Sequence, residues 1–126
     1  MEPKQGLIGV VGNCAAGKTT LVKGLTAKGL PAVNIAQEHS TVQKLWQRKQ
    51  PDFLVCLSCT LAAAKKRRTI SWGQERLNDQ WKRLAHAQEH SDLYLATDDL
   101  SIEEVQQTVI HAYKAYLCKQ KLTTVS

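Results

Sequence analysis

Residues 12–19 read GNCAAGKT, so that four residues separate Gly12 from the run Gly17-Lys18-Thr19. Each residue type in this pattern suits the binding of a polyphosphate. Glycines let the backbone curl until several N–H groups converge on phosphate oxygens, and a helix that follows adds its positive N-terminus. A lysine ammonium reaches the outer phosphates, and a threonine hydroxyl can coordinate Mg²⁺. The pattern therefore predicts that Lys18 contacts phosphate and that Thr19 contacts a metal ion.

The segments on either side of this pattern favour the same interpretation. Residues 7–12, LIGVVG, are nearly all apolar, as expected of a strand that is buried on both faces. Residues 18–28 have apolar side chains at helical spacing and are followed by Gly29, a typical C-terminal stop. A loop between a strand and a helix is where phosphate binding requires the pattern. We expect a phosphate-binding loop of Gly12, Asn13, Cys14, Ala15, Ala16, Gly17, Lys18, Thr19 and Thr20.

The rest of the chain alternates strand-like and helix-like patterns. Apolar stretches at 31–38, 52–59 and 92–98 predict three more strands, and helices are expected at 41–50, in one or two pieces over 60–91, and after a capping box formed by Ser101 and Glu104. Such alternation is typical of a parallel sheet covered by helices. We predict a single α/β domain over residues 1–126, with a three-layer αβα arrangement and a mostly parallel sheet of about four strands.

Composition limits the classes of partner. The 126 residues are 43% hydrophobic and 22% charged, and no apolar run approaches the ~18 residues that cross a bilayer. We expect no membrane partner. The start of the sequence lacks the basic and apolar regions of a signal peptide, which favours a cytoplasmic location. The net charge of +6 suits a polyanion, which could be a nucleotide, a nucleic acid or an acidic protein surface.

Several segments resemble those of a known group. The sequence GNCAAGKTT resembles the phosphate loop of P-loop NTPases, and PDFLVCLSC (51–59), RRTISWGQERL (67–77) and DLYLATDDLSIEEV (92–105) are similar to segments of the small kinases in that group. The resemblance implies the sheet order 2-3-1-4 and binding of ATP with Mg²⁺. It also implies a basic lid over the triphosphate, supplied by Arg67 or Arg68, and a contact between Asp98 and the adenine base.

The sequence departs from those kinases at one catalytic position. A carboxylate normally ends the strand beside the phosphate loop and organises Mg²⁺ through water, but Ser58 holds the aligned position here. Glu38 ends the second predicted strand and would emerge at the edge of the sheet where ligands of α/β sheets bind. Glu38 is therefore the expected base or metal-water organiser. The alternative is a solvated acid near a helix start.

Other motifs have ordinary alternatives. The basic run Lys65–Arg68 can be a solvated helix face instead of a lid. Cys56 and Cys59 have C-x-x-C spacing, but residues i and i+3 of a strand point to opposite faces, so they are not expected to chelate one metal. Cys14 lies close to Lys18 and to a helix N-terminus, which favours its thiolate. Oxidation of Cys14, including pairing with Cys59, is a hypothesis for blocking nucleotide binding.

Three functions remain open from the sequence. The first is kinase-like phosphoryl transfer or slow ATP hydrolysis, with Lys18, Glu38, Arg67 and Arg68 as catalytic residues and with Thr19 and Glu38 at the metal. The second is a nucleotide-binding switch or sensor that has little catalysis and acts through a protein partner or a homodimer. The third is a nucleotide-controlled nucleic-acid binder, whose affinity would fall steeply with salt.

Overall fold

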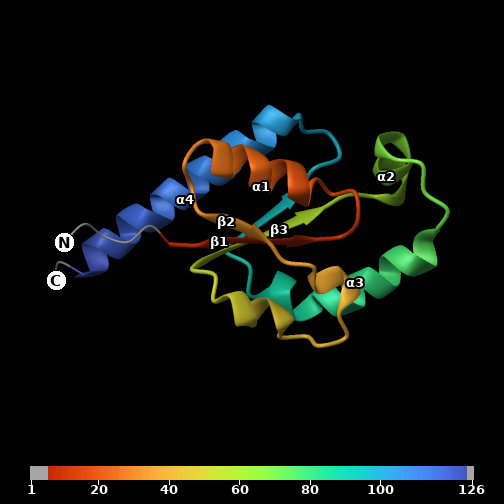
Figure 1. Ribbon diagram of the computed structural model, residues 1–126, viewed down its shortest axis with the longest axis horizontal. Coiled ribbons are helices and arrows are strands. Elements are labelled where there is room, and N and C mark those ends of the chain that lie inside the picture. The colour runs from red at the N-terminus through yellow and green to blue at the C-terminus, as the bar shows by residue number, and fades with distance from the viewer. Residues whose placement is uncertain (1–5, 125–126) are drawn as a thin grey trace.

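A computed structural model of the chain describes residues 6–124, with side chains described as far as residue 120. Residues 1–5, on which the expectation about a signal peptide partly depends, lie outside this range. The strands are β1 (Ile8–Gly12), β2 (Ala32–Asn34), β3 (Phe53–Ser58) and β4 (Leu93–Ala96). The helices are α1 (Lys18–Ala27), α2 (Leu61–Arg67), α3 (Gln74–Glu89) and α4 (Ile102–Thr124), with 3₁₀ helices η1 (Gln37–His39) and η2 (Leu45–Lys49) (Figure 1).

The four strands form one sheet in which every pairing is parallel. This confirms the predicted α/β class and the strand number. The predicted order 2-3-1-4 is wrong, because the strands lie in the order β2-β1-β3-β4. Both orders place β1 and β3 in the middle, so the apolar character of those two strands fits either. The order 2-3-1-4 is what the resemblance to kinases implies. In the structure, β2 pairs with β1 from Ile8 to Val10, and β4 pairs with β3 from Val55 to Ser58.

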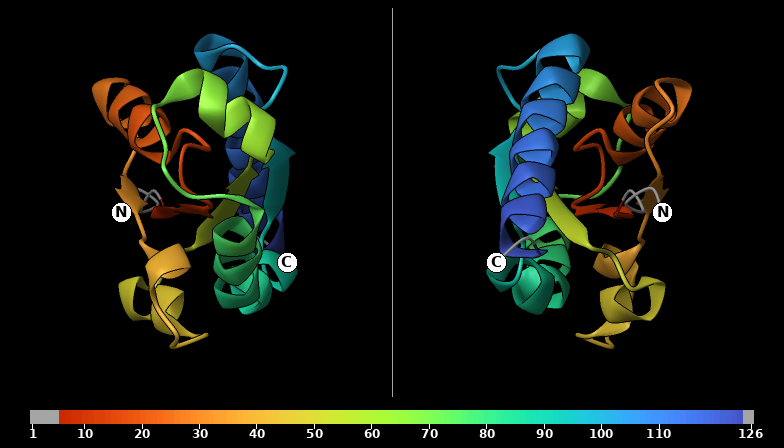
Figure 2. Two further views of the ribbon diagram at one scale, coloured as in Figure 1. Left: turned by 90° about the vertical axis from the view of Figure 1, so that its right-hand side faces the viewer. Right: turned by 90° about the vertical axis from the view of Figure 1, so that its left-hand side faces the viewer.

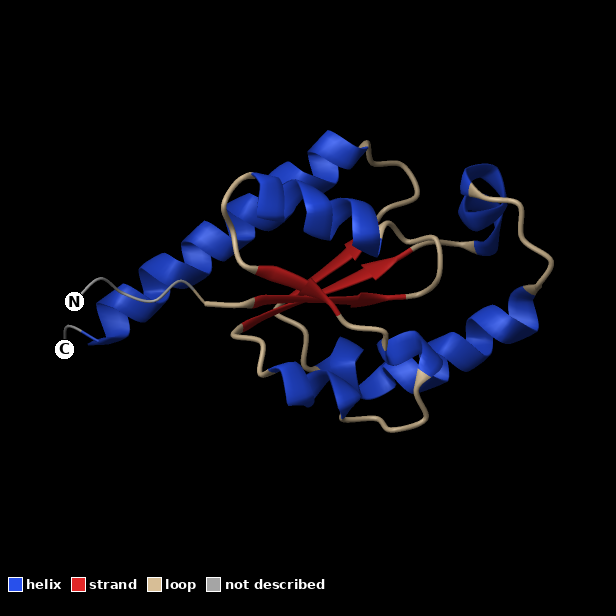
Figure 3. Cartoon of the chain, viewed as in Figure 1, coloured by secondary structure: helices blue, strands red, loops and turns tan. Residues whose placement is uncertain are grey.

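Helices cover both faces of the sheet (Figure 3). Helices α1 and α4 lie on one face and enclose the larger core, which contains Phe53, Val55 and Tyr113. Helix α3 lies on the other face together with η1 and η2, over a smaller core that contains Leu54 and Cys56 (Figure 2). Cys59 belongs to the larger core. The prediction that Cys56 and Cys59 point to opposite faces is therefore confirmed.

The segment expected to be a helix over 41–50 has a different structure. Its only helical part in the structure is the 3₁₀ helix η2. Tertiary hydrogen bonds explain the difference, because the buried Gln37 side chain donates to Val42 O (2.8 Å) and accepts from Trp46 N (2.9 Å). The Trp46 indole also donates to His86 Nδ1 on α3 at 3.0 Å. These bonds hold the segment against α3 in place of an α-helical turn.

The last helix begins as the sequence predicts. Glu104 N donates to Ser101 Oγ and Ser101 N donates to Glu104 Oε1, both at 3.0 Å, which is a capping box. The hydrogen bonds to the Glu104 carboxylate lower its pKa. Within residues 6–124, no helix combines the length and the apolar character required to cross a bilayer.

Candidate phosphate-binding site

The loop between β1 and α1 has a curled backbone. Gly17 has φ +100° and Ala15 has φ +69°, both in the left-handed region. Gly12 lies against β3, because a Cβ at this position would come within 2.3 Å of Leu57 O. Glycine is therefore required at position 12 for close approach to the neighbouring strand, and at position 17 for the turn into α1.

The curled loop leaves a run of donors available. In the described part of the chain, no protein acceptor is bonded to the backbone N–H groups of Ala15, Gly17, Lys18, Thr19 and Thr20. The last three belong to the first turn of α1, where a helix has no internal partners for its N–H groups. A run of such donors at a helix N-terminus attracts anions, since the helix dipole adds positive potential. The loop has the backbone arrangement that phosphate binding needs.

Two buried polar side chains, Asn13 and Gln80, hold the loop in place through hydrogen bonds. Asn13 accepts from Cys59 N at 3.0 Å and donates to Cys59 O at 3.2 Å, which ties the loop to the end of β3. Gln80 on α3 is 2% exposed, accepts from Cys14 N at 2.9 Å and donates to Cys14 Sγ at 3.3 Å. The loop is therefore held to both β3 and α3.

Lys18 and Glu38 form a buried ion pair. Lys18 Nζ lies 2.5 Å from Glu38 Oε2 and 3.2 Å from Asn13 O, and the two side chains are 9% and 4% exposed. The other carboxylate oxygen, Glu38 Oε1, is buried and has no hydrogen-bond partner in the structure. An unpaired buried acceptor is costly, which makes this oxygen a place where a ligand, metal ion or ordered water would bind. The expectation that Glu38 ends the second strand is wrong, because β2 ends at Asn34 and Glu38 lies in η1. Glu38 nevertheless lines the Lys18 cavity at the edge of the sheet where it was expected.

Two cavities flank the loop, and Ala15 and Gly17 line both. The first, which we call the Lys18 cavity, has a volume of about 400 Å³ and is also lined by Lys18, Thr19, Asn34, Glu38 and His39. The second, which we call the α4 cavity, has a volume of about 380 Å³ and is lined by Leu21, Thr97, Leu100, Ile102 and Val105. The Lys18 cavity is lined mainly by polar and charged side chains, whereas the α4 cavity combines apolar side chains with Arg67 and Arg68.

Arg67 is bound to protein backbone at the α4 cavity. Its guanidinium donates to Ala15 O (2.9 Å), to Thr97 Oγ1 (3.0 Å) and to Thr97 O (2.5 Å). The Thr97 hydroxyl is also within hydrogen-bond distance of Ala16 O (3.0 Å) and Ser58 O (3.1 Å). Arg67 thus connects the loop to the end of β4. This arrangement differs from a mobile lid over the triphosphate, because the guanidinium already has three acceptors.

Arg68 and Asp98 lie in different surroundings. Arg68 is exposed and lines both cavities, so it is the arginine of the basic run that can reach a molecule in either one. Asp98 accepts from Thr60 N (3.0 Å) and Thr60 Oγ1 (2.7 Å) and lines a third cavity beside Ser58. The hydrogen bond from the Thr60 side chain is the main reason that the pKa of Asp98 is lowered. The structure does not bring Asp98 to the α4 cavity, where Thr97 lies instead.

The structure adds three residues that were not predicted at the site. Asn34 donates to Thr19 Oγ1 at 3.2 Å, Gln80 holds Cys14, and Thr97 lines the α4 cavity. Gln80 left a signal in the sequence, since it falls in the helical stripe of Leu77 and Leu84, where a polar residue requires a partner. Asn34 is the last residue of β2, and Thr97 follows the last residue of β4. Nothing in their spacing distinguished them from ordinary loop residues.

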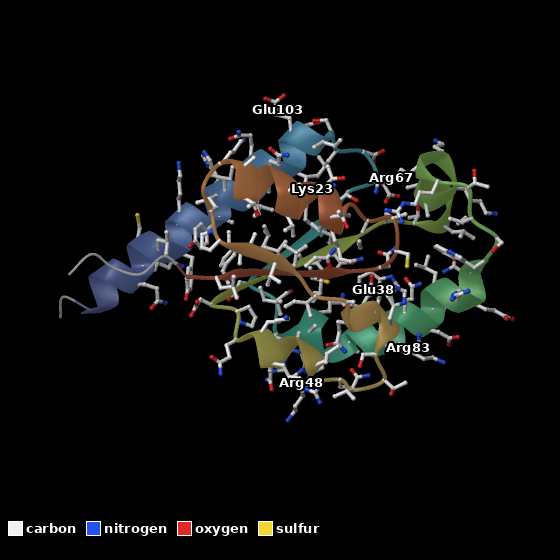
Figure 4. The ribbon with its side chains drawn as sticks, in the orientation of Figure 1. Lys23, Glu38, Arg48, Arg67, Arg83 and Glu103 are labelled. Carbon is white, nitrogen blue, oxygen red and sulfur yellow. The ribbon has the colours of Figure 1, made fainter. Side chains whose placement is uncertain are left out.

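Figure 4 shows Arg67 and Glu38 at the same end of the sheet, with Arg67 on the α1 side and Glu38 on the η1 side. This is the carboxyl end of parallel strands, the usual ligand-binding edge of such sheets. No protein-family model matches the sequence, and no curated protein is similar to it. The interpretation of the site therefore depends on its own geometry.

Proposed function

We propose that this chain is a P-loop protein that binds ATP with Mg²⁺ at residues 12–20 and slowly hydrolyses it or transfers its terminal phosphoryl group. One observation carries the proposal: five backbone N–H groups without protein acceptors surround Lys18 at a helix N-terminus, with a cavity on either side. The outer phosphates would occupy the Lys18 cavity. The base and sugar would occupy the α4 cavity, where Leu100, Ile102 and Val105 offer apolar surface to a purine.

The residues of the Lys18 cavity fit a magnesium ion. Thr19 offers a hydroxyl and Glu38 offers the carboxylate oxygen that lacks a partner, and hard oxygen donors are what Mg²⁺ prefers. When bound, the ion would shield the charge of the phosphates. Thr19 Oγ1 accepts from Asn34 at 3.2 Å, which occupies one lone pair of the hydroxyl and leaves the other for a metal ion or its water. These two residues are the proposed metal ligands, directly or through water.

Arrival of a triphosphate would change the partner of Lys18. The ammonium now contacts Glu38, and phosphate oxygens compete for it through stronger negative charge. Once released, Glu38 is the carboxylate in this cavity that can accept a proton from an attacking water or hydroxyl. Arg68, which lines both cavities, would stabilise the charge on the transferred group. In this scheme Arg67 positions the loop through Ala15.

The same ion pair favours a second candidate, a nucleotide-binding switch. Glu38 lies in η1, and Arg83 of α3 donates to Glu38 O at 3.4 Å. Breaking the contact between Lys18 and Glu38 would therefore alter a segment that also contacts α3. A partner protein could detect this change without any turnover. The two candidates share the nucleotide site and differ in whether Glu38 performs chemistry.

One comparison tests both candidates. ATP binding is measured with a fluorescent ATP analogue and turnover by phosphate release, for the wild type, Lys18→Ala, Glu38→Gln and Lys23→Ala. Lys23 is an exposed lysine of the same helix and serves as the matched control (Figure 4). We expect Lys18→Ala to weaken binding by about 100-fold, the loss of a charge-assisted contact, and Lys23→Ala to leave it unchanged.

Turnover then separates the two candidates. Loss of turnover in Glu38→Gln with retained binding supports the enzyme. Tight binding without turnover in the wild type supports the switch. Equal binding by the wild type and Lys18→Ala contradicts both. Competition with GTP in the same assay reports base preference.

A further inference from the structure

Three side chains of types that can bind metal ions lie close together in the lining of the Lys18 cavity. Cys14 Sγ lies 3.8 Å from His39 Nε2, and His39 Nε2 lies 3.8 Å from Glu38 Oε2. One ligand atom from each of the three residues lies within 4.8 Å of the others. All three residues line the cavity. Cys14 comes from the phosphate loop and the other two come from η1, so the fold, not sequence adjacency alone, assembles the group.

The spacing is close to what a bound zinc ion requires. With metal–ligand distances of ~2.3 Å for sulfur and ~2.0 Å for nitrogen or oxygen, a tetrahedral site separates sulfur from nitrogen by roughly 3.6 Å and nitrogen from oxygen by roughly 3.3 Å. The two observed separations to His39 Nε2, both 3.8 Å, are larger by up to about half an ångström, and the sulfur and the carboxylate lie within 4.8 Å of each other. His39 is exposed, with 57% of its side chain accessible, so its ring can move by that amount without disturbing the core.

A second observation points to a ligand in the same place. Glu38 is 3% exposed, yet its Oε1 has no hydrogen-bond partner in the structure. Oε2, the oxygen whose distance to His39 is given above, is paired with Lys18. A cation would therefore either take the place of Lys18 at Oε2 or bind the unpaired Oε1 beside it. A buried acceptor without a partner at the edge of a cluster of sulfur and nitrogen donors is explained if a metal ion completes it.

The position of the sulfur is also fixed. Gln80, a buried side chain of α3, donates to Cys14 Sγ and accepts from Cys14 N, so it orients both the thiol and the loop that carries it. Partners of this kind around a metal ligand raise affinity by holding the ligand in position. Cys59 has other contacts, because its Sγ lies 3.3 Å from Asn13 Nδ2 and 3.7 Å from Cys14 O. It is therefore not part of the group.

We propose that Cys14, Glu38 and His39 bind a zinc-class divalent ion, with the fourth coordination position open to the Lys18 cavity. A mixed set of thiolate, imidazole and carboxylate favours zinc over magnesium or calcium. On binding, the Cys14 thiol forms a bond to the metal and releases its proton to solvent, and the imidazole binds through Nε2 in its neutral form. The site needs no nucleotide. It would compete with nucleotide-bound Mg²⁺ for the Glu38 carboxylate.

Direct metal binding to the nucleotide-free protein tests this site. The chain is stripped with a chelator, kept reduced with a phosphine, and titrated with Co²⁺ while the near-ultraviolet thiolate-to-cobalt charge-transfer band is recorded. Zn²⁺ is then added to displace Co²⁺, and its affinity is measured against a chromophoric indicator. We expect one equivalent of metal and a charge-transfer band in the wild type.

Matched variants assign the ligands. We expect Cys14→Ser to remove the charge-transfer band. Cys14→Ser, His39→Asn and Glu38→Gln should each weaken Zn²⁺ binding by ~100-fold or more. This loss is at least as large as that for residues that only support a metal ligand. Cys118→Ser and His111→Asn alter exposed side chains of α4 and should bind as the wild type does. Circular dichroism of each variant excludes loss of the fold, and His39→Asn provides the test if Glu38→Gln is unstable.

Three results would overturn the proposal. They are a charge-transfer band that persists in Cys14→Ser, wild-type zinc affinity no tighter than that of His39→Asn, or affinity lost only on substitution of the stacked pair His86 and His90. Because no nucleotide is present, failure of this site leaves the proposed ATP binding untouched. Failure of ATP binding likewise leaves the metal titration valid.

Discussion

The two cavities beside the phosphate loop are built in different ways. The α4 cavity is held by Arg67 and Thr97, whose hydrogen bonds to the loop are satisfied in the structure. The Lys18 cavity is held by an ion pair, and its carboxylate has an unpaired oxygen. The polar groups that hold the α4 cavity therefore have partners within the protein, whereas one carboxylate oxygen of the Lys18 cavity has none. We therefore expect that nucleotide binding, as proposed, would rearrange the Lys18 cavity and leave the α4 cavity in place.

The largest effect on stability is expected from Glu38→Gln. Removing one partner of a buried ion pair leaves an uncompensated charge, which costs about 3–5 kcal/mol, and the lower end applies because this pair borders a cavity. We expect the free energy of unfolding to fall by about 3 kcal/mol in Glu38→Gln and by less in the double variant Lys18→Met/Glu38→Gln. Urea unfolding measures both, with Glu75→Gln on the exposed face of α3 as control. A double variant less stable than Glu38→Gln would contradict the account.

A smaller loss is expected at the α4 cavity. Arg67→Ala removes three hydrogen bonds and leaves Ala15 O and Thr97 O without this donor. Hydrogen bonds to a charged group contribute about 1.5–3 kcal/mol, so we expect unfolding to become easier by about 2 kcal/mol. Lys66→Ala, one residue earlier in α2, should change stability by less than about 0.5 kcal/mol. Equal effects of the two variants would show that Arg67 does not secure the loop.

Asp98 should stabilise the protein only when it is ionised. Its pKa is lowered in the folded state, so its stabilisation is present above the pKa of the unfolded chain and is lost as pH falls through the folded value. We expect Asp98→Asn to cost about 0.5–1 kcal/mol at pH 7, a small value because the side chain is partly exposed, and the difference from the wild type to vanish in acid. Asp99→Asn is the control. A difference that grows in acid would contradict this sign.

The smallest effect on stability is expected from thiol labelling, which reports how accessible each cysteine is. Burial raises the pKa of Cys56 to about 12 and also raises that of Cys59, so neither should react with a thiol reagent at neutral pH. Exposed Cys118 should react, and half-buried Cys14 should react unless ATP fills the Lys18 cavity. Mass spectrometry of the labelled peptides gives the rates. Faster labelling of Cys56 than of Cys118 would contradict the burial described here.

The sequence predicted the parts of the site that depend on local pattern. The strand before the loop, the glycine-dependent turn and the helix after it follow from glycine positions and apolar spacing. Glu38 was expected at this edge as the end of a strand. The structure brings it there in η1, after β2 has ended. The contact of Glu38 with Lys18 could not be predicted, because it depends on the lateral position of β2. That position came from the resemblance to kinases, and the observed order differs.

Side-chain partners explain the other differences. The resemblance implied a lid supplied by Arg67 or Arg68, but the Arg67 guanidinium donates to the carbonyl oxygens of Ala15 and Thr97. The resemblance to kinases implied a contact between Asp98 and the base, but the Asp98 carboxylate accepts from the Thr60 hydroxyl instead. The helix expected over 41–50 was overridden by Gln37 and His86. These hydrogen-bond partners are distant in sequence, and the local sequence pattern does not identify them.

Helix α4 gives the α4 cavity a mechanical connection to a distant surface. Its 23 residues span about 34 Å, and its far part runs past the end of the sheet in Figure 1. Ile102 and Val105 line the cavity, and the Tyr113 hydroxyl donates to Gly6 O at 2.6 Å near the middle of the helix. The helix packs against the larger core through Val105, Val109 and Tyr113. The same continuous helix therefore forms part of the wall of the α4 cavity and extends to a surface beyond the sheet.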